Sequence, residues 1–238
     1  MPRDTPGLSP GLGLSLTHSV YEHLRADLLA CRLRPGERLK ISDLCGSLAV
    51  SLGAVREALS RLTSEGLVVA EPQRGFRVAP ISATELRDLT EVRIEVEARC
   101  LRRAVAEGDM AWETAIVAAH HVMSRLPERE PEDPGRVNDA WGAAHARFHQ
   151  ALVAGCASPW LLRLRDTLYD QSERYRRLSV PLSRHGRDVT GEHRAIMEAT
   201  VSRRADLACA LLAEHFRATT QILLGTDAAG GIGAALDP

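Results

Sequence analysis

The pattern of apolar and polar residues over the first third of the chain predicts a small helical unit that ends in a β-hairpin. Apolar residues recur at helical spacing in three segments, each opened by a Ser or Thr suited to cap it: 17–31 (Thr17), 43–48 (Ser42) and 52–65 (Ser51). Gly66 is expected to end the third helix. Short apolar runs on either side of the turn 72–75 predict two strands, 67–71 and 76–80. Three helices followed by a hairpin are typical of a winged helix-turn-helix.

Beyond Pro80 the pattern predicts helices only, beginning with a long one over 82–107 whose first residues, Ser82-Ala83-Thr84-Glu85, form a capping box. The further helical segments are 109–126, 136–155, 158–179, 188–202 and 203–224. The fold class is therefore mainly α, with an N-terminal winged helix-turn-helix and a C-terminal all-helical bundle. We expect a flexible arm (1–16), the winged unit (17–80), a helical effector, metal-binding and dimerisation domain (81–225) and a disordered Gly/Ala-rich tail (226–238).

Composition narrows the class of protein without identifying it. No apolar run approaches the roughly 18–20 residues that span a bilayer, so no membrane association is expected. The five cysteines are scattered and lack CxxC spacing, which favours a reducing cytoplasm over a disulfide framework. The first 80 residues hold ten Lys or Arg and eight Asp or Glu, a net charge of only +2. Nucleic-acid binding must therefore come from the placement of residues rather than from bulk charge.

The third predicted helix has the features of a DNA-recognition helix. Val55, Leu59 and Leu62 form an inward stripe, whereas Arg56 lies on another face together with small residues. Such an arginine can donate a bidentate pair of hydrogen bonds to guanine in the major groove. A small helical subdomain with a solvated arginine would show the same pattern.

The segment PGERLKISDLCGSLAVSLGAVREALSRLTSEGLV, followed by PQRGFRV, resembles the DNA-binding domain of GntR-family bacterial transcription factors. The resemblance implies that Arg56 contacts DNA and that the wing tip approaches the minor groove. The expected DNA-binding residues are Ser51, Gly53, Arg56, Ser60, Gln73, Arg74 and Gly75. Many family members carry an arginine directly after the serine that opens the helix, where this chain has Leu52, so an operator sequence cannot be transferred from them.

Four histidines lie on stripes that should face the interior of the helical domain. His145 and His149 are four residues apart in HARFH, and His193 and His215 lie on two later helices. A buried polar ring without a partner costs about 1–3 kcal/mol. Ordinary hydrogen bonds could satisfy each ring separately, but two ligands at i and i+4 with two more from facing helices is also how helical bundles build metal sites. The other histidines (18, 23, 120, 121 and 185) show no such pattern and are assigned to surface or structural roles.

An all-helical domain after a GntR-type winged helix is similar to the FCD domain of the FadR-type branch. That resemblance implies a metal held by D-x-x-x-H on one helix, by the histidine of E-H-R-A-I on another, and by a histidine on the last helix. His149, His193 and His215 match these positions, and His145 stands where the family usually has aspartate. His145 is therefore either a fourth metal ligand, which changes the metal preference, or a direct contact to the effector. The implied cofactor is a divalent transition metal, with zinc expected and nickel as the alternative, and the implied effector is a small organic acid.

Arg93 is the predicted effector-binding residue, because it interrupts an apolar stripe that should face inward. A slightly rotated helix would instead leave it on the surface. The sequence does not rank the other candidate arginines: Arg147, Arg163, Arg174 and Arg194.

Three functions are compatible with these features. The first is a ligand-responsive transcription regulator, expected to be a repressor, which binds a palindromic operator as a homodimer. The second is a metal-dependent hydrolase; HARFH lacks the glutamate of H-E-x-x-H, and Glu192 and Glu214 are expected to point away from the ligand faces. The third is a helical scaffold that binds a protein partner and has ordinary core histidines.

Overall fold

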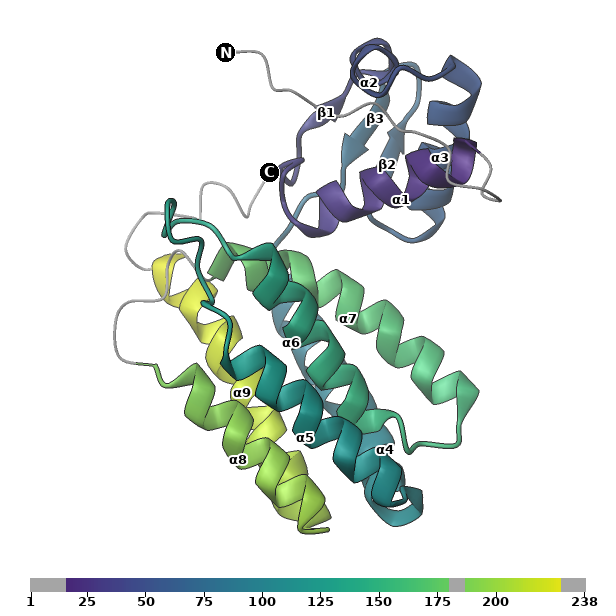
Figure 1. Ribbon diagram of the computed structural model, residues 1–238. Helices are drawn as coiled ribbons and strands as arrows, with labels where there is room; N and C mark the ends of the chain where they lie inside the picture. Colours follow the sequence, from purple (N-terminus) through teal and green to yellow (C-terminus); the bar gives the residue numbers. More distant parts are fainter. Residues whose placement is uncertain (1–15, 180–186, 228–238) are drawn as a thin grey trace. The chain divides into compact units, whose positions relative to one another are not determined.

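The computed structural model describes residues 16–179 and 187–227, drawn in colour in Figure 1. These residues form two compact units, one up to Ile81 and the other from Ser82 onward. The predicted arm and tail lie outside the described residues, except that Leu16 and residues 226–227 belong to helices. In the described ranges no helix is both long and apolar enough to cross a membrane.

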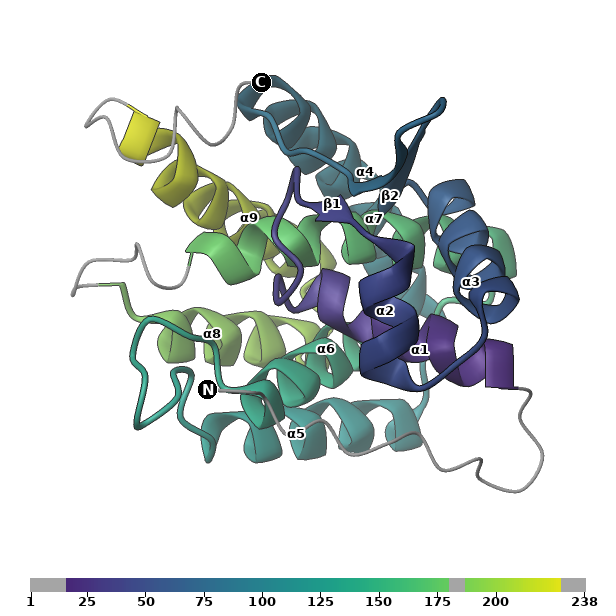
Figure 2. The same ribbon diagram turned by 90° about the horizontal axis from the view of Figure 1, so that it is seen from above.

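The first unit is a three-helix domain with a small antiparallel sheet. Its elements are α1 (Leu16–Leu29), β1 (Arg38–Leu39), α2 (Ile41–Leu48), α3 (Leu52–Ser64), β2 (Val68–Glu71) and β3 (Gly75–Val78). The strand order is β1-β3-β2, and the β2–β3 hairpin protrudes from the unit (Figure 2). Its core is the α1–α3 contact, where Leu24, Leu59 and Leu62 are almost fully buried. The unit is thus a winged helix-turn-helix, as predicted.

Several local expectations for this unit are corrected by the structure. Strand β1 was not predicted, because two residues are too few to show an alternating pattern. Helix α2 begins at Ile41 after Lys40, and the Ser42 hydroxyl bonds to Asp43 instead of capping the helix. Thr17 lies inside α1 rather than before it. The Ser51 cap is confirmed, since its hydroxyl oxygen accepts the Ala54 N–H at 3.3 Å.

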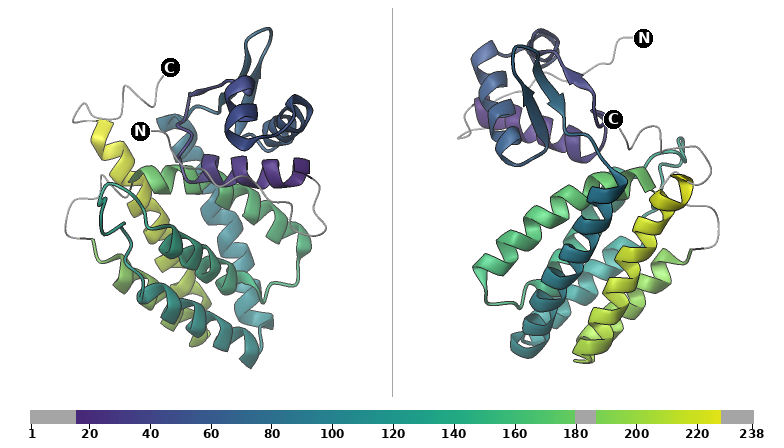
Figure 3. Two further views of the ribbon diagram at one scale, coloured as in Figure 1. Left: turned by 45° about the horizontal axis from the view of Figure 1, so that its top comes forward. Right: turned by 180° about the vertical axis from the view of Figure 1, so that it is seen from behind.

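The second unit is all-helical in the described residues apart from a single bridge between Arg129 and Val137. Its helices are α4 (Ala83–Glu107), α5 (Met110–Ser124), α6 (Asp139–Val153), α7 (Pro159–Ser179), α8 (Val189–Val201) and α9 (Ala205–Asp227). Helix α4 lies between α7 and α9 (Figure 3, right), while α5 packs on α6 and α8. Apolar side chains such as Leu101, Phe148 and Ile196 are fully buried where these helices meet.

The capping box at the start of α4 is only half formed. The Ser82 hydroxyl accepts the Glu85 N–H at 3.0 Å, as predicted. The return bond is replaced by Tyr175 of α7, whose hydroxyl donates to the Glu85 carboxylate at 3.0 Å and accepts the Ser82 N–H at 3.4 Å. A tyrosine from another helix therefore ties α7 to the first turn of α4.

Candidate functional site

The recognition helix α3 separates its packing face from its polar face. Val55, Leu59 and Leu62 are fully buried, whereas Arg56 and Ser60 are exposed. Gly53 is exposed in the first turn, where a Cβ would have open space apart from the Ser51 hydroxyl 4.0 Å away. The predicted DNA-facing residues of this helix therefore share an accessible surface that is free to approach a groove.

The wing is a hairpin whose tip carries the other predicted DNA contacts. Gln73, Arg74 and Gly75 are all exposed, and Gln73 and Gly75 adopt φ values of +61° and +90°. A left-handed φ favours glycine, so Gly75 allows the chain to turn into β3 without strain. The Arg74 carbonyl accepts a 2.9 Å hydrogen bond from the Arg38 guanidinium of β1, which anchors the tip to the sheet.

Leu52 begins α3 with 55% of its surface exposed. Leu52 therefore presents an apolar side chain on the accessible surface, at the position where the resemblance noted above would place an arginine in many family members. The expectation that an operator sequence cannot be transferred from such members stays a prediction.

In the helical unit, α6, α8 and α9 bring the four predicted histidines together. His145 and His149 come from α6, His193 from α8 and His215 from α9, and all four are at least 94% buried. Each offers one ring nitrogen such that the four atoms lie within 4.8 Å of one another. The Nε2 atoms of His145 and His149 are 3.1 Å apart. The spacing that suggested a shared helix face in the sequence therefore produces a cluster.

The imidazoles of this cluster are neutral. Burial, reinforced by the neighbouring histidines and arginines, holds the pKa of His145, His149 and His193 well below the usual value of 6.5. Burial also lowers the pKa of His215, although its hydrogen bond to Glu192 works in the opposite direction. A neutral ring nitrogen with a lone pair is the form that ligates a metal.

Buried ring nitrogens without partners show that the protein alone does not satisfy this cluster. His145 Nδ1, His149 Nδ1 and His193 Nε2 are buried and have no hydrogen-bond partner. Buried polar atoms are usually paired, and each exception calls for an explanation such as an ion or a water molecule. A nitrogen-rich donor set with unpaired lone pairs fits a divalent transition metal such as zinc, nickel or copper.

His215 differs from the other three because its outer nitrogen is paired. Its Nδ1 lies 2.7 Å from the Glu192 carboxylate, whose two oxygens also accept hydrogen bonds from Arg187. The expectation that Glu192 points away from the ligand faces is therefore wrong: the α8 backbone turns its side chain towards α9. Burial opposes the effect, but the bonds from His215 and Arg187 lower the pKa of Glu192 to about 2.

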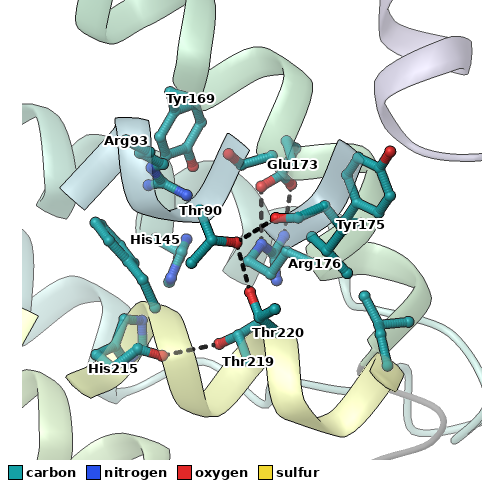
Figure 4. A pocket seen from close by; sticks show the side chains of 14 residues that line it. Thr90, Arg93, His145, Tyr169, Glu173, Tyr175, Arg176, His215, Thr219 and Thr220 are labelled. Atoms are coloured by element: carbon teal, nitrogen blue, oxygen red, sulfur yellow. Dashed lines mark hydrogen bonds and ion pairs between the residues drawn. The ribbon is translucent and has the colours of Figure 1, made fainter. Parts of the chain in front are cut away.

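A cavity adjoins the cluster between α4, α7 and α9 (Figure 4). It encloses about 480 Å³ including its open mouth, and His145 and His215 lie on its border. Arg93 lines it and is 8% exposed, so the inward orientation predicted for this residue is confirmed. The Arg93 guanidinium lies 3.9 Å from the centre of the Phe216 ring and 3.4 Å from the Glu97 carboxylate.

Two further donors face this cavity. The Tyr169 hydroxyl and Arg176 Nη1 are buried without a hydrogen-bond partner, and both residues line the cavity. The remaining guanidinium nitrogens of Arg176 bond to both carboxylate oxygens of Glu173, at 2.8 and 2.5 Å. Burial raises the pKa of Tyr169, so the phenol stays protonated and can donate a hydrogen bond. Unpaired donors and buried guanidinium groups favour an anionic ligand.

The sequence did not identify Tyr169 and Arg176, although α7 carried a usable signal. Arg165, Tyr169, Glu173 and Arg176 recur at helical spacing and are all buried, so the inward stripe of this helix is largely polar. The other candidate arginines stay away from the cavity: Arg147, Arg163 and Arg194 are exposed, and Arg174 is buried without lining it.

Comparison with known proteins places both units. Residues 16–78 match bacterial regulatory proteins of the gntR family, and residues 88–218 match the FCD domain. The chain is 40% identical over 209 residues to the uncharacterized HTH-type transcriptional regulator BphR of Paraburkholderia xenovorans, covering 88% of this chain and 85% of that protein. It is 34% identical over 199 residues to the HTH-type transcriptional repressor GlaR of Escherichia coli, covering 82% of this chain and 90% of that protein.

The fold also matches that of the E. coli protein McbR/YncC, with a TM-score of 0.74 at 21% identity, over 90% of this chain and 99% of that one. The relatives named above are transcription regulators, so the hydrolase and scaffold alternatives are set aside.

Proposed function

Because this chain belongs to the gntR family of bacterial regulatory proteins and is a ligand-responsive, DNA-binding transcription regulator with an FCD domain, we propose that a metal-held organic acid controls it. In this proposal His145, His149, His193 and His215 hold a divalent transition metal, with zinc expected and nickel the alternative. The observation that carries the proposal is the set of converging neutral imidazoles with unpaired ring nitrogens.

The four proposed metal ligands are all neutral, and this determines the charge of the effector that the site would attract. A divalent ion held by neutral nitrogens keeps its full positive charge, whereas an aspartate in place of His145 would cancel part of it. An oxyanion in the adjoining cavity would restore that balance. A metal bound by these histidines would supply an electrostatic anchor, and the chain's own donors would supply the rest of the binding site.

The chain's own donors would orient the acid. Arg93 offers a buried guanidinium from α4, and Tyr169 and Arg176 of α7 offer unpaired donors. All three point into the cavity that His145 and His215 border (Figure 4). A small carboxylate bound there would satisfy groups that the protein leaves unpaired, and hydrogen bonds to charged groups contribute about 1.5–3 kcal/mol each.

Tyr175 gives the cavity a physical route towards the DNA-binding unit. It lines the cavity, and its hydroxyl bonds to Ser82 and Glu85 in the first turn of α4. Ser82 directly follows Ile81, the last residue of the winged unit. A ligand that moves Tyr175 would therefore act on the residues through which the chain connects the two units.

On DNA, the protein is proposed to act as a homodimeric repressor at a palindromic operator, with Arg56 reading a base in each half-site and Gln73, Arg74 and Gly75 in the minor groove. The effector would act only if it binds the DNA-competent and DNA-incompetent geometries with different affinities. A difference of about 1–2 kcal/mol per subunit would change occupancy several-fold to tenfold or more.

A gel-shift assay with the protein's own promoter region tests this function. We expect a specific complex that weakens with salt. Titrating a panel of small mono- and dicarboxylates with zinc present should identify an acid that changes the amount of complex, and adding a chelator should remove that response. The proposal fails if no specific complex forms, or if no acid changes the complex in a metal-dependent manner.

A further inference from the structure

One buried histidine has a carboxylate behind it, and that carboxylate is itself held in place. His215 Nδ1 lies 2.7 Å from Glu192 Oε2. Arg187 donates to both oxygens of the same carboxylate, from Nε at 2.8 Å and from Nη2 at 2.7 Å. The result is a chain of three side chains, Arg187–Glu192–His215, that leads inward from the start of α8 to the histidine cluster.

The chemistry of this chain fixes the proton on His215. Both oxygens of the Glu192 carboxylate already accept hydrogen bonds from the Arg187 guanidinium, so this group acts as an acceptor and the 2.7 Å contact makes His215 Nδ1 the donor. The 3.3 Å approach of Arg187 Nη2 to the same nitrogen is then a close contact rather than a hydrogen bond, because both atoms are donors. The lone pair of the ring is left on Nε2.

Arg187 is anchored independently of the carboxylate. Its Nη1 donates to the Thr219 hydroxyl at 2.9 Å, and its Nη2 donates to the His215 carbonyl at 2.9 Å. The guanidinium thus grips both the side chain of α8 and the backbone of α9. Glu192 consequently has little freedom to leave His215.

We propose that Glu192, held by Arg187, is a positioning residue that fixes His215 as the Nδ1–H tautomer and turns its Nε2 lone pair to the metal. This inference rests on the proposed metal site. The other three histidines have no such carboxylate partner: His145 Nδ1, His149 Nδ1 and His193 Nε2 are unpartnered within the described residues. Carboxylate partners of this kind orient the ring and raise its basicity, and their loss weakens metal binding by about 10- to 100-fold.

The test compares Glu192→Gln with Glu198→Gln, an exposed glutamate on the same helix. Glutamine keeps the size of the side chain and can still accept a hydrogen bond, but it lacks the charge and can also present a donor. Zinc affinity is measured by competition with a chromophoric chelator on full-length protein. Long-range ¹H–¹⁵N correlation spectra of the metal-free protein report the tautomer of His215 directly.

We expect a single Nδ1–H tautomer in the wild type and in Glu198→Gln, and a mixture of tautomers in Glu192→Gln. We also expect Glu192→Gln to bind zinc about 10- to 100-fold more weakly, with the control unchanged. Arg187→Gln should weaken zinc binding in the same direction. Equal zinc affinity of wild type and Glu192→Gln would overturn the positioning role but leave the metal site standing. Absence of zinc binding in the wild type would overturn both.

Discussion

The two units of this regulator place their functional side chains in opposite environments. In the described part of the winged unit no polar or charged side chain is fully buried, apart from the largely apolar ring of Tyr21, and the predicted DNA contacts are exposed. In the helical unit the candidate ligand-binding residues are themselves part of the interior. Arg93, Glu97, Glu173 and the four histidines are all less than 9% exposed.

This difference has an energetic consequence. Exposed side chains such as Arg56 can be exchanged with little effect on folding, since surface substitutions usually change stability by less than about 0.5 kcal/mol. Buried polar groups cost desolvation free energy whenever they lack a partner. The helical unit should therefore be stabilised by its ligands, whereas the winged unit needs none to fold.

Lowering the pH should have the largest effect on the difference in folding stability between the two units. The pKa values of His145, His149 and His193 are lowered in the folded state, so below about pH 6.5 the unfolded chain binds protons that the folded chain does not. The full free energy of unfolding of the helical unit is therefore reached above that pH. Below it, the free energy of unfolding falls by up to about 1.4 kcal/mol per pH unit for each of these histidines.

Thermal melts of metal-free protein between pH 7 and pH 5 measure this effect, because histidine is the side chain whose unperturbed pKa lies in this range. We expect the unfolding transition of the helical unit to move to lower temperature as the pH is lowered. The control variant His121→Ala, which lacks an exposed histidine, should show the same shift as the wild type. An unfolding temperature of the helical unit that does not depend on pH over this range would contradict the conclusion that these imidazoles are buried in their neutral form.

Arg56→Ala should have the next largest effect, and on DNA binding alone. A bidentate contact to guanine contributes about 1–3 kcal/mol, so losing one in each half-site should weaken the specific complex by about 30-fold or more. The melting temperature should not change, because Arg56 is exposed. Arg99→Ala removes the same charge from an exposed position on α4 and should bind the operator normally. Unchanged affinity in Arg56→Ala would show that another surface reads the DNA.

Arg93→Gln should weaken binding of the organic acid and leave metal binding unchanged. Removing a charged donor from the cavity should weaken carboxylate binding by about 10-fold or more, from the 1.5–3 kcal/mol of a charge-assisted hydrogen bond. Isothermal titration of the metal-loaded protein measures this loss. Arg163→Gln, at an exposed arginine that stacks on Trp160, is the matched control. Equal losses in both variants would argue for a general charge effect rather than a contact in the cavity.

Tyr175→Phe should have the smallest effect on stability, about 1 kcal/mol for the lost hydrogen bonds. Acid binding should persist, because the ring still lines the cavity. The effect of the acid on DNA binding should decrease, since the bonds to Ser82 and Glu85 are gone. A gel shift with and without acid measures this difference, and a full response in the variant would exclude Tyr175 as the connection.

The parts of the structure that depend on local pattern could be predicted from sequence. The apolar stripes located the helices, and Ser51 and Ser82 cap helices as their positions suggested. The convergence of the four histidines followed from the interior stripes of three helices, one of which carries both His145 and His149.

Features that depend on neighbours distant in sequence could not be predicted. Strand β1 exists only because β3 pairs with it, and the Glu85 half of the capping box is diverted to Tyr175, ninety positions along the chain. The orientation of Glu192 was predicted wrongly, because the register between α8 and α9 decides which side chain of α9 it contacts. The polar stripe of α7 has meaning only beside the charges of α4, where Arg165 bonds to Glu97.

The central claim is that the buried histidines form a metal site, and metal content per chain tests it most directly. Untagged protein purified without chelator should be analysed by plasma mass spectrometry beside a His149→Ala/His193→Ala double variant. The account predicts about one zinc or nickel ion per wild-type chain and none in the variant, as expected for a single site built from these side chains. No bound metal in the wild type, after reloading with zinc and with nickel, would contradict it.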